Sequence, residues 1–74
     1  MISINDAVEK VKVITEEKVK QVSDYKSKYY LVLVEGGSPY YIVNKDNGDT
    51  RFLNPLEDIS ALAKSINNKV LRRY

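Results

Sequence analysis

This chain has no cysteine, no histidine and no tryptophan. Without cysteine it forms no disulfide and offers no thiolate nucleophile or Cys-ligated zinc site, whereas small secreted domains often rely on disulfide bridges. Without histidine it lacks the side chain most used in acid–base catalysis near neutral pH, which is also the commonest metal ligand. We therefore expect a cytoplasmic protein that is not an enzyme and that carries no metal and no cofactor.

Long apolar runs and a strong excess of one charge are also missing. No segment approaches the roughly 20 apolar residues that span a bilayer. The first residues, MISINDAVEK, lack the basic-then-apolar order of a signal peptide. The formal net charge is only +2, which does not by itself indicate a polyanionic partner. These absences predict a soluble chain without a membrane partner.

What is present is the composition of a small globular protein. Of the 74 residues, 43% are hydrophobic and 30% are charged, which excludes wholesale disorder. A chain of this length buries only about 60% of the surface that it exposes when unfolded. We expect a single domain, residues 1–74, of modest stability.

The N-terminal residues have the spacing of an amphipathic helix. Apolar side chains recur at intervals of three and four residues: Ile4, Ala7, Val8, Val11 and Ile14. Ser3 or Asn5 is suited to cap the start, and Asp6 complements the helix dipole. The pattern predicts a helix from about residue 4 to 14. Beyond it, a continued helix and a turn followed by a short strand over 19–25 both fit, and we favour the strand.

Two strand-forming runs enclose a glycine turn. Residues 29–34 and 40–43 are β-branched, aromatic or leucine, and Glu35-Gly36-Gly37-Ser38 lies between them, which predicts a β-hairpin. The expected register pairs Leu33 with Tyr40, Val32 with Tyr41, Leu31 with Ile42 and Tyr30 with Val43. Both faces of this hairpin are apolar, so both need to be covered by the chain itself or by a partner.

One face of the hairpin is our candidate protein-binding surface. It carries Tyr30, Val32, Tyr41 and Val43. The chain has six tyrosines, and tyrosine is enriched at interfaces because it offers contact area with little side-chain entropy to lose. We expect this face to contact another protein or a second copy of the chain in a homodimer.

The second half of the chain contains a further turn and a helix start. Asp46-Asn47-Gly48 predicts a turn, because Asn and Gly tolerate positive φ, and a short strand over 51–53 follows. Asn54-Pro55, with Glu57, predicts a second helix that runs to about residue 65 or 68. Its apolar stripe is Leu56, Ile59, Leu62, Ala63 and Ile66. The tail 70–74 either extends this helix or lies free.

These elements predict an α+β fold. Its order is an N-terminal helix, an antiparallel β meander of three to four strands and a C-terminal helix, with both helices packed against the sheet.

Two turns invite a ligand-binding interpretation that the sequence does not support. Aligning Gly48 with the invariant glycine of a calcium loop puts Lys45 at a ligand position and Asn54 where a bidentate Glu belongs. Gly36-Gly37-Ser38 is followed by a strand instead of the helix that a phosphate loop requires. We expect both to be plain turns.

Basic and aromatic residues are interleaved over residues 18–30, KVKQVSDYKSKYY, as on surfaces that bind single-stranded nucleic acid. Nucleic-acid binding is therefore the alternative function, with cationic side chains on phosphates and a tyrosine stacked on a base. The candidate residues are Lys18, Lys20, Lys26, Lys28, Tyr29, Arg72 and Arg73.

The segments ISINDAVEKVK, TEEKVKQV and YYLVLVEGGSPYYIVNKDNGDTRFL together resemble a PepSY-type domain over residues 2–53. Those small modules have a helix, a β meander and a strand that ends in a D-x-x-G-type turn, like the turn at Asp46–Asp49. The resemblance implies a non-enzymatic module that binds or inhibits another protein, often a peptidase. The leading expectation is thus a protein-binding module, such as an inhibitor, immunity or accessory protein of a bacterium or phage, that acts by steric occlusion.

Overall fold

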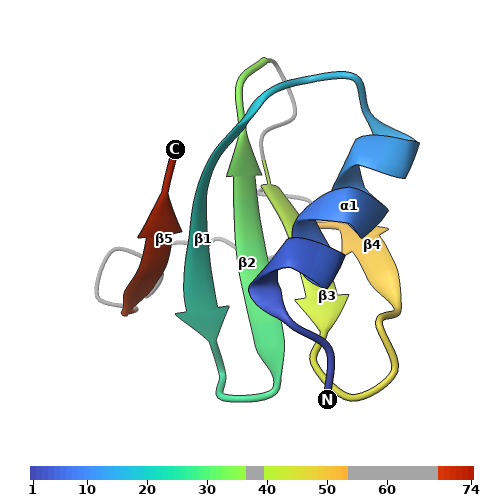
Figure 1. Cartoon of the computed structure of the whole chain (residues 1–74), viewed down its shortest axis with the longest axis vertical. Helices are drawn as coiled ribbons and strands as arrows, with labels where there is room; N and C mark the ends of the chain where they lie inside the picture. Colours follow the sequence, from blue (N-terminus) through green and yellow to red (C-terminus); the bar gives the residue numbers. More distant parts are fainter. Residues whose placement is uncertain (37–39, 54–68) are drawn as a thin grey trace.

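The computed structural model describes residues 1–36, 40–53 and 69–74. These residues form one helix and five strands, an α+β arrangement as predicted (Figure 1). The elements are α1 (Ile4–Ile14), β1 (Val19–Tyr25), β2 (Tyr29–Val34), β3 (Tyr40–Asn44), β4 (Thr50–Phe52) and β5 (Val70–Arg73). The predicted second helix falls on residues 54–68 and lies outside the described residues.

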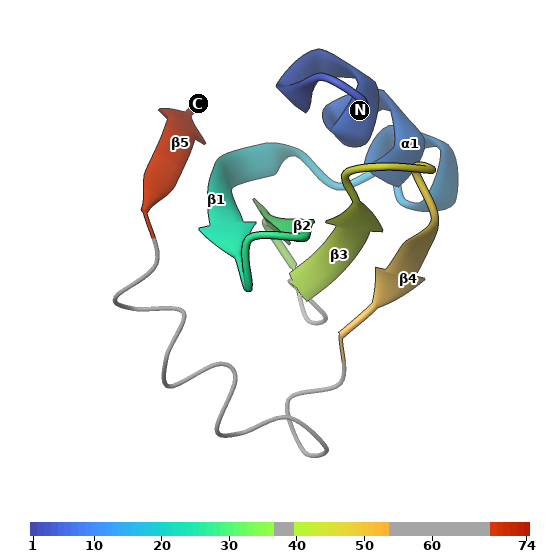
Figure 2. The same cartoon turned by 90° about the horizontal axis from the view of Figure 1, so that it is seen from below.

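The five strands form one antiparallel sheet in the order β4-β3-β2-β1-β5, so β4 and β5 are its edges. α1 lies across one face of the sheet and contacts β1, β2 and β3 (Figures 1 and 2). We call this face the helix side and the opposite face the far side. The termini of the chain lie at separate places, the N-terminus below α1 and the C-terminus after β5.

α1 spans the predicted residues because its start is capped and its apolar stripe faces the sheet. The Ser3 hydroxyl accepts a hydrogen bond from the Asp6 backbone N–H at 3.1 Å, and the Asp6 carboxylate accepts one from the Ser3 N–H at 3.3 Å. This reciprocal capping box satisfies two N–H groups at the helix start. Ala7, Val8 and Val11 are buried against the sheet.

Ser3→Ala removes one half of this capping box. We expect the free energy of unfolding to fall by about 1 kcal/mol, as is typical for the loss of a serine cap. The midpoint of urea denaturation, followed by circular dichroism, measures the change. An unchanged midpoint would contradict the capping role of Ser3.

The central strands confirm the predictions for residues 19–25, 29–34 and 40–43. β2 and β3 pair in the expected register, including Val32 with Tyr41 and Leu31 with Ile42. β1 and β2 are joined by a tight turn in which Lys26 and Ser27 have φ of 53° and 62°. β3 is one residue longer than expected and ends at Asn44.

The predicted turn at residues 46–48 is confirmed. Gly48 has φ of +78°, a conformation that L side chains rarely adopt. The Asn44 side-chain oxygen accepts the Asp46 N–H at 2.8 Å, which holds the chain at the end of β3. β4 then begins at Thr50, one residue earlier than expected, and the buried Leu53 follows it.

The tail of the chain corrects the sequence prediction. Residues 70–73 neither extend a helix nor lie free, because they form β5 and pair antiparallel with β1. Hydrogen bonds from the Asp24 N–H to the Lys69 carbonyl and from the Tyr74 N–H to the Lys20 carbonyl, 2.8 and 2.9 Å, bracket this strand. The sheet therefore has five strands and not three to four, because β1 had a free edge that the tail completes.

Apolar side chains are buried on both sides of the sheet. On the helix side the buried cluster consists of Ala7, Val8, Val11, Val19, Val22, Tyr30, Val32, Val34 and Val43. On the far side the buried residues are Tyr25, Leu31, Ile42 and Leu53, with Tyr29 and Tyr40 partly buried beside them. The two clusters follow from the period of two along each strand.

Candidate interaction surface

The face that we expected to bind a partner is the one that α1 covers. Tyr30, Val32 and Val43 are buried in the helix-side cluster, and Val32 and Val43 are both 0% exposed. Tyr41 is only partly buried and packs against the same cluster. A partner could contact the first three only if α1 left the sheet, so their placement as an open protein-binding surface is wrong.

Tyr30 has a structural role at this position. Its hydroxyl donates a hydrogen bond to the Ile2 carbonyl at 2.9 Å, which ties the residues before α1 to the sheet. The Lys45 ammonium lies 5.2 Å from the Tyr30 ring centroid and pairs with the Asp24 carboxylate. The Tyr30 hydroxyl is thus hydrogen-bonded within the fold, as is usual for a buried tyrosine.

A different apolar surface is open to solvent. Among the described residues the large hydrophobic side chains that remain exposed are Met1, Val13, Ile14, Phe52 and Tyr74. Val13 (87% exposed) and Ile14 (53%) belong to the last turn of α1, and Phe52 (40%) belongs to β4. That turn lies on the β4 side of the molecule in both views (Figures 1 and 2). We call these three residues the apolar corner.

Phe52 is held in place on the helix side of β4. It pairs with Tyr41 across the strands, and the two rings meet edge to face with centroids 5.9 Å apart. Such pairs are favourable beyond the area that they bury. The exposed aromatic side chain therefore has a defined position, which lowers the entropy lost when a partner covers it.

β4 is an edge strand whose outer backbone groups follow from its register. Hydrogen bonds join the Asn44 N–H to the Asp49 carbonyl at 2.7 Å and the Leu53 N–H to the Tyr40 carbonyl at 2.9 Å. In an antiparallel ladder the bonded positions alternate, so the Arg51 backbone bonds to β3. The N–H and C=O groups of Thr50 and Phe52 then point away from β3, toward an edge on which the described residues place no further strand.

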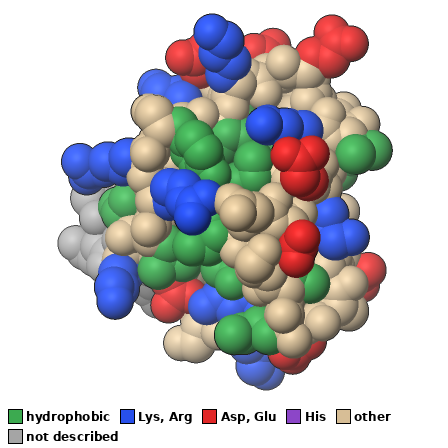
Figure 3. Space-filling model, in the orientation of Figure 1, with side chains coloured by type: hydrophobic (Ala, Val, Ile, Leu, Met, Phe, Trp, Pro, Cys, Tyr) green, Lys and Arg blue, Asp and Glu red, His purple; other side chains and the backbone are tan. Residues whose placement is uncertain are grey.

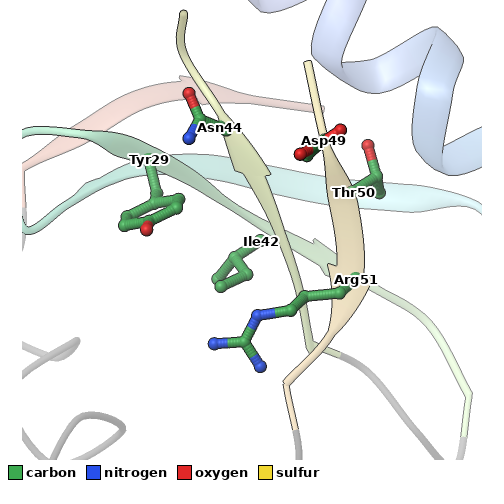
Figure 4. A pocket seen from close by; sticks show the side chains of 6 residues that line it. All are labelled: Tyr29, Ile42, Asn44, Asp49, Thr50 and Arg51. Atoms are coloured by element: carbon green, nitrogen blue, oxygen red, sulfur yellow. The ribbon is translucent and has the colours of Figure 1, made fainter. Parts of the chain in front are cut away.

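The far side of β4 carries charged side chains beside a small cavity. The cavity has a volume of about 190 Å³ and is lined by Tyr29, Ile42, Asn44, Asp49, Thr50 and Arg51 (Figure 4). Arg51 pairs with Ile42 and extends toward it, over the cavity. Asp49 directly precedes β4 and its backbone pairs with Asn44, so the ladder continues through it and its side chain shares the far side with that of Arg51. The described ion pairs, Glu9–Lys12 and Asp24–Lys45, do not include either of them.

The residues proposed for nucleic-acid binding do not form one groove. Lys18 precedes β1 and Lys20 is its second residue, whereas Lys26 and Lys28 lie at the turn after it, at the opposite end of a seven-residue strand. Figure 3 shows lysine and arginine side chains spread over the helix side, separated by acidic and apolar groups.

Two of the remaining candidates, Arg72 and Tyr29, already have partners within the fold. The Arg72 guanidinium donates to the Asn5 side chain of α1, and Arg73 lies opposite Gln21 on the other side of the edge strand. The Tyr29 ring lies 6.2 Å from the Tyr25 ring and is partly buried, so it is not presented for stacking on a base.

The sequence analysis did not identify the apolar corner or the charged side chains of Asp49 and Arg51 on the far side. One signal was visible, since Val13 falls off the apolar stripe of α1 and so has no place in its buried face. Phe52 gave no such signal, because a short strand with alternating residues does not show which of its faces is covered.

In the described part of the chain, no group of three acidic, histidine or cysteine side chains is placed to hold a metal ion. In the same residues, no helix is long and apolar enough to cross a bilayer. Comparison of the chain with protein-family models, curated proteins and solved structures finds no match. The resemblance to PepSY-type domains therefore stays a prediction.

Proposed function

We propose that this chain is a small, non-enzymatic protein-binding module. The observation that carries the proposal is the coincidence of the apolar corner with the open edge of β4. Single exposed apolar residues are ordinary, but Val13, Ile14 and Phe52 lie on the side of the molecule that carries the edge strand β4, where a further strand can add (Figure 1).

The contact surface that we propose consists of Ile14, Val13 and Phe52 together with the outer backbone of β4. The backbone groups of Thr50 and Phe52 offer main-chain hydrogen bonds to an added strand. The apolar corner offers area that is lost from water on binding, at about 25 cal/mol per Å². The two contributions act on the same partner because they lie on the same side of the molecule.

Steric occlusion is the mode of action that we propose. A rigid domain of this size that seats its β4 edge on another protein covers part of that protein's surface without chemistry. An inhibitor, immunity or accessory protein works in this way, and the PepSY resemblance points to the same class.

The proposal predicts that a stoichiometric partner binds through the apolar corner. The wild-type chain is immobilised and exposed to extract of its native host, and the bound protein is quantified. The double variant Ile14→Ser/Phe52→Ser should retain at least about tenfold less of that partner, since it loses most of the exposed apolar area at this corner.

The matched control is Tyr74→Ser, which removes a large exposed side chain after β5 and should retain the partner fully. Circular dichroism checks that each variant is folded. Equal retention by the double variant would show that the surface lies elsewhere, and the absence of any stoichiometric partner would refute the proposed function.

A further inference from the structure

The charged side chains of Asp49 and Arg51, on the far side, can pair with the same two side chains of a second copy when the two β4 strands run antiparallel. Asp49 and Arg51 flank Thr50 at equal spacing. If two β4 strands lie antiparallel with Thr50 opposite Thr50, Arg51 of each copy lies opposite Asp49 of the other. Opposite charges at directly paired positions stabilise an antiparallel ladder.

The backbone allows this register. The antiparallel ladder with β3 uses the backbone groups of Arg51, so those of Thr50 point outward. A bonded pair in an antiparallel ladder exchanges two N–H to C=O hydrogen bonds. A two-fold axis midway between the two copies of Thr50 therefore places the outward N–H of each opposite the outward C=O of the other. The same axis makes Asp49 of one copy and Arg51 of the other a closely spaced, non-bonded pair.

From this coincidence of backbone and charge we propose that the β4 edge binds a second copy of this chain. The product is a symmetric dimer with one continuous sheet across the two-fold axis. The inference rests on the proposed function, since it identifies the protein that the β4 edge covers as a second copy of the chain. It also replaces the homodimer that the sequence predicted through Tyr30, Val32, Tyr41 and Val43.

Other registers and edges are less suitable for self-association. A register with Arg51 opposite Arg51 of the second copy would bring two like charges together, and the backbone of Arg51 already bonds to β3. At the other edge of the sheet, β5 presents Arg72 and Arg73 without an acidic residue and pairs with β1 through a register irregularity. Charges and bulges of this kind protect an edge strand from pairing.

A pairing of β4 with β5 of another copy would be heterologous. Such contacts build rings or open chains instead of two-fold dimers. The symmetric β4 contact closes on itself and leaves β5 at the two ends of the continuous sheet.

The apolar corner fits the same arrangement. A two-fold axis perpendicular to the sheet keeps both copies of α1 on the helix side, and the last turn of each α1 lies on the β4 side of its own copy (Figure 2). Val13 and Ile14 then approach the contact from both copies. This accounts for the exposed apolar side chains of Val13 and Ile14 in that turn.

Charge reversal tests the register directly. Asp49→Arg sets two arginine pairs across the axis, and Arg51→Asp sets two aspartate pairs. Sedimentation velocity from about 10 μM to about 1 mM should show a dimer for the wild type and an association about tenfold weaker or more for each single variant. Both substituted side chains are exposed, so the protomer should stay folded.

An equimolar mixture of the two variants separates pairing from general charge effects. The Asp49→Arg chain carries arginine at positions 49 and 51, and the Arg51→Asp chain carries aspartate at both positions. When one chain of each kind pairs, every cross-strand contact at these positions joins an arginine to an aspartate. We expect the mixture to dimerise about as well as the wild type. Dimers in the mixture but not in either component support the inference.

Thr50→Cys provides a second readout in this cysteine-free chain. Bonded residues in an antiparallel pair have Cα atoms about 5.5 Å apart, within the range that a disulfide spans. Mild oxidation should give a covalent dimer, whereas Ser3→Cys, exposed at the start of α1, should not.

Three results overturn the inference: a wild type that is monomeric at about 1 mM, single variants that dimerise like the wild type, or a mixture that stays monomeric. The wild type can be monomeric and yet retain a host protein that the Ile14→Ser/Phe52→Ser variant does not retain. In that case the proposed function stands and only the identity of the partner is wrong. If the substitutions change neither self-association nor the retention of a host protein, both proposals fail.

Discussion

Val32→Asp is expected to abolish folding. Val32 is 0% exposed in the centre of the helix-side cluster, on the middle strand of the sheet. A carboxylate at this position has no cationic partner in that cluster and must be desolvated, a change that costs at least about 4 kcal/mol. The whole stability of a small domain lies near the lower end of about 5–15 kcal/mol. Circular dichroism and the dispersion of amide proton resonances should therefore report an unfolded chain.

Val13→Asp is the matched control, because it makes the same chemical change at a position that is 87% exposed. We expect the fold to persist with a loss of less than about 1 kcal/mol, from the negative charge near the C-terminal end of the helix dipole. A folded Val32→Asp variant would show that the face beneath α1 is open, as the sequence first suggested.

Removal of residues 70–74 is expected to destabilise the domain strongly. Val70 and Leu71 are partly buried, and Leu71 packs against the helix-side cluster, so their burial and the hydrogen bonds to β1 are lost together. We estimate the loss at about 3 kcal/mol from the usual contributions of buried apolar groups and backbone hydrogen bonds. The midpoint of urea denaturation of the shortened chain measures it.

Removal of Tyr74 alone distinguishes the contribution of β5 from that of the last residue. Tyr74 is 60% exposed, and its removal costs the hydrogen bond from its N–H to the Lys20 carbonyl while the pairs of residues 70–73 with β1 remain, so this variant should lose only about 1 kcal/mol. If the chain without residues 70–74 were as stable as the full chain, β5 would not be part of the cooperative fold.

The local signals in the sequence were sufficient for α1 and for the central hairpin. The stripe from Ile4 to Val11 has one face that can be buried, and Ser3 with Asp6 defines where the helix begins. The register of β2 and β3 followed from the short glycine turn, because side chains alternate strictly along paired strands. Each of these elements depends on residues that are close in sequence.

β5 could not be predicted in the same way. Val70-Leu71-Arg72-Arg73 has no alternation of apolar and polar residues, and it becomes a strand because β1 offers it an edge. That edge is formed by residues about 50 positions earlier in the chain. Strand formation of this kind depends on tertiary contacts more than on local propensity.

The candidate surface was misplaced for a related reason. The hairpin is apolar on both faces, and the pattern alone does not show which face α1 covers. Once α1 packs over Val32 and Val43, the open apolar groups are those at the rim, Ile14 and Phe52, which the hairpin pattern does not include. The charge pairing at β4 becomes visible only when the register shows which backbone groups point outward.

Hydrogen exchange of the β4 amides tests the central claim, that this edge is the binding surface, most directly. Among residues 1–36, 40–53 and 69–74, no strand pairs with the outward N–H of Thr50 in an isolated protomer, and this N–H is bonded when a strand pairs with the edge. The Arg51 N–H bonds to β3 in both states. We expect the Thr50 amide to exchange quickly in dilute solution and to become protected as the protein concentration rises, with the Arg51 amide unchanged. If the protection of Thr50 does not depend on concentration or on a bound partner, the β4 edge is not a binding surface and the account is contradicted.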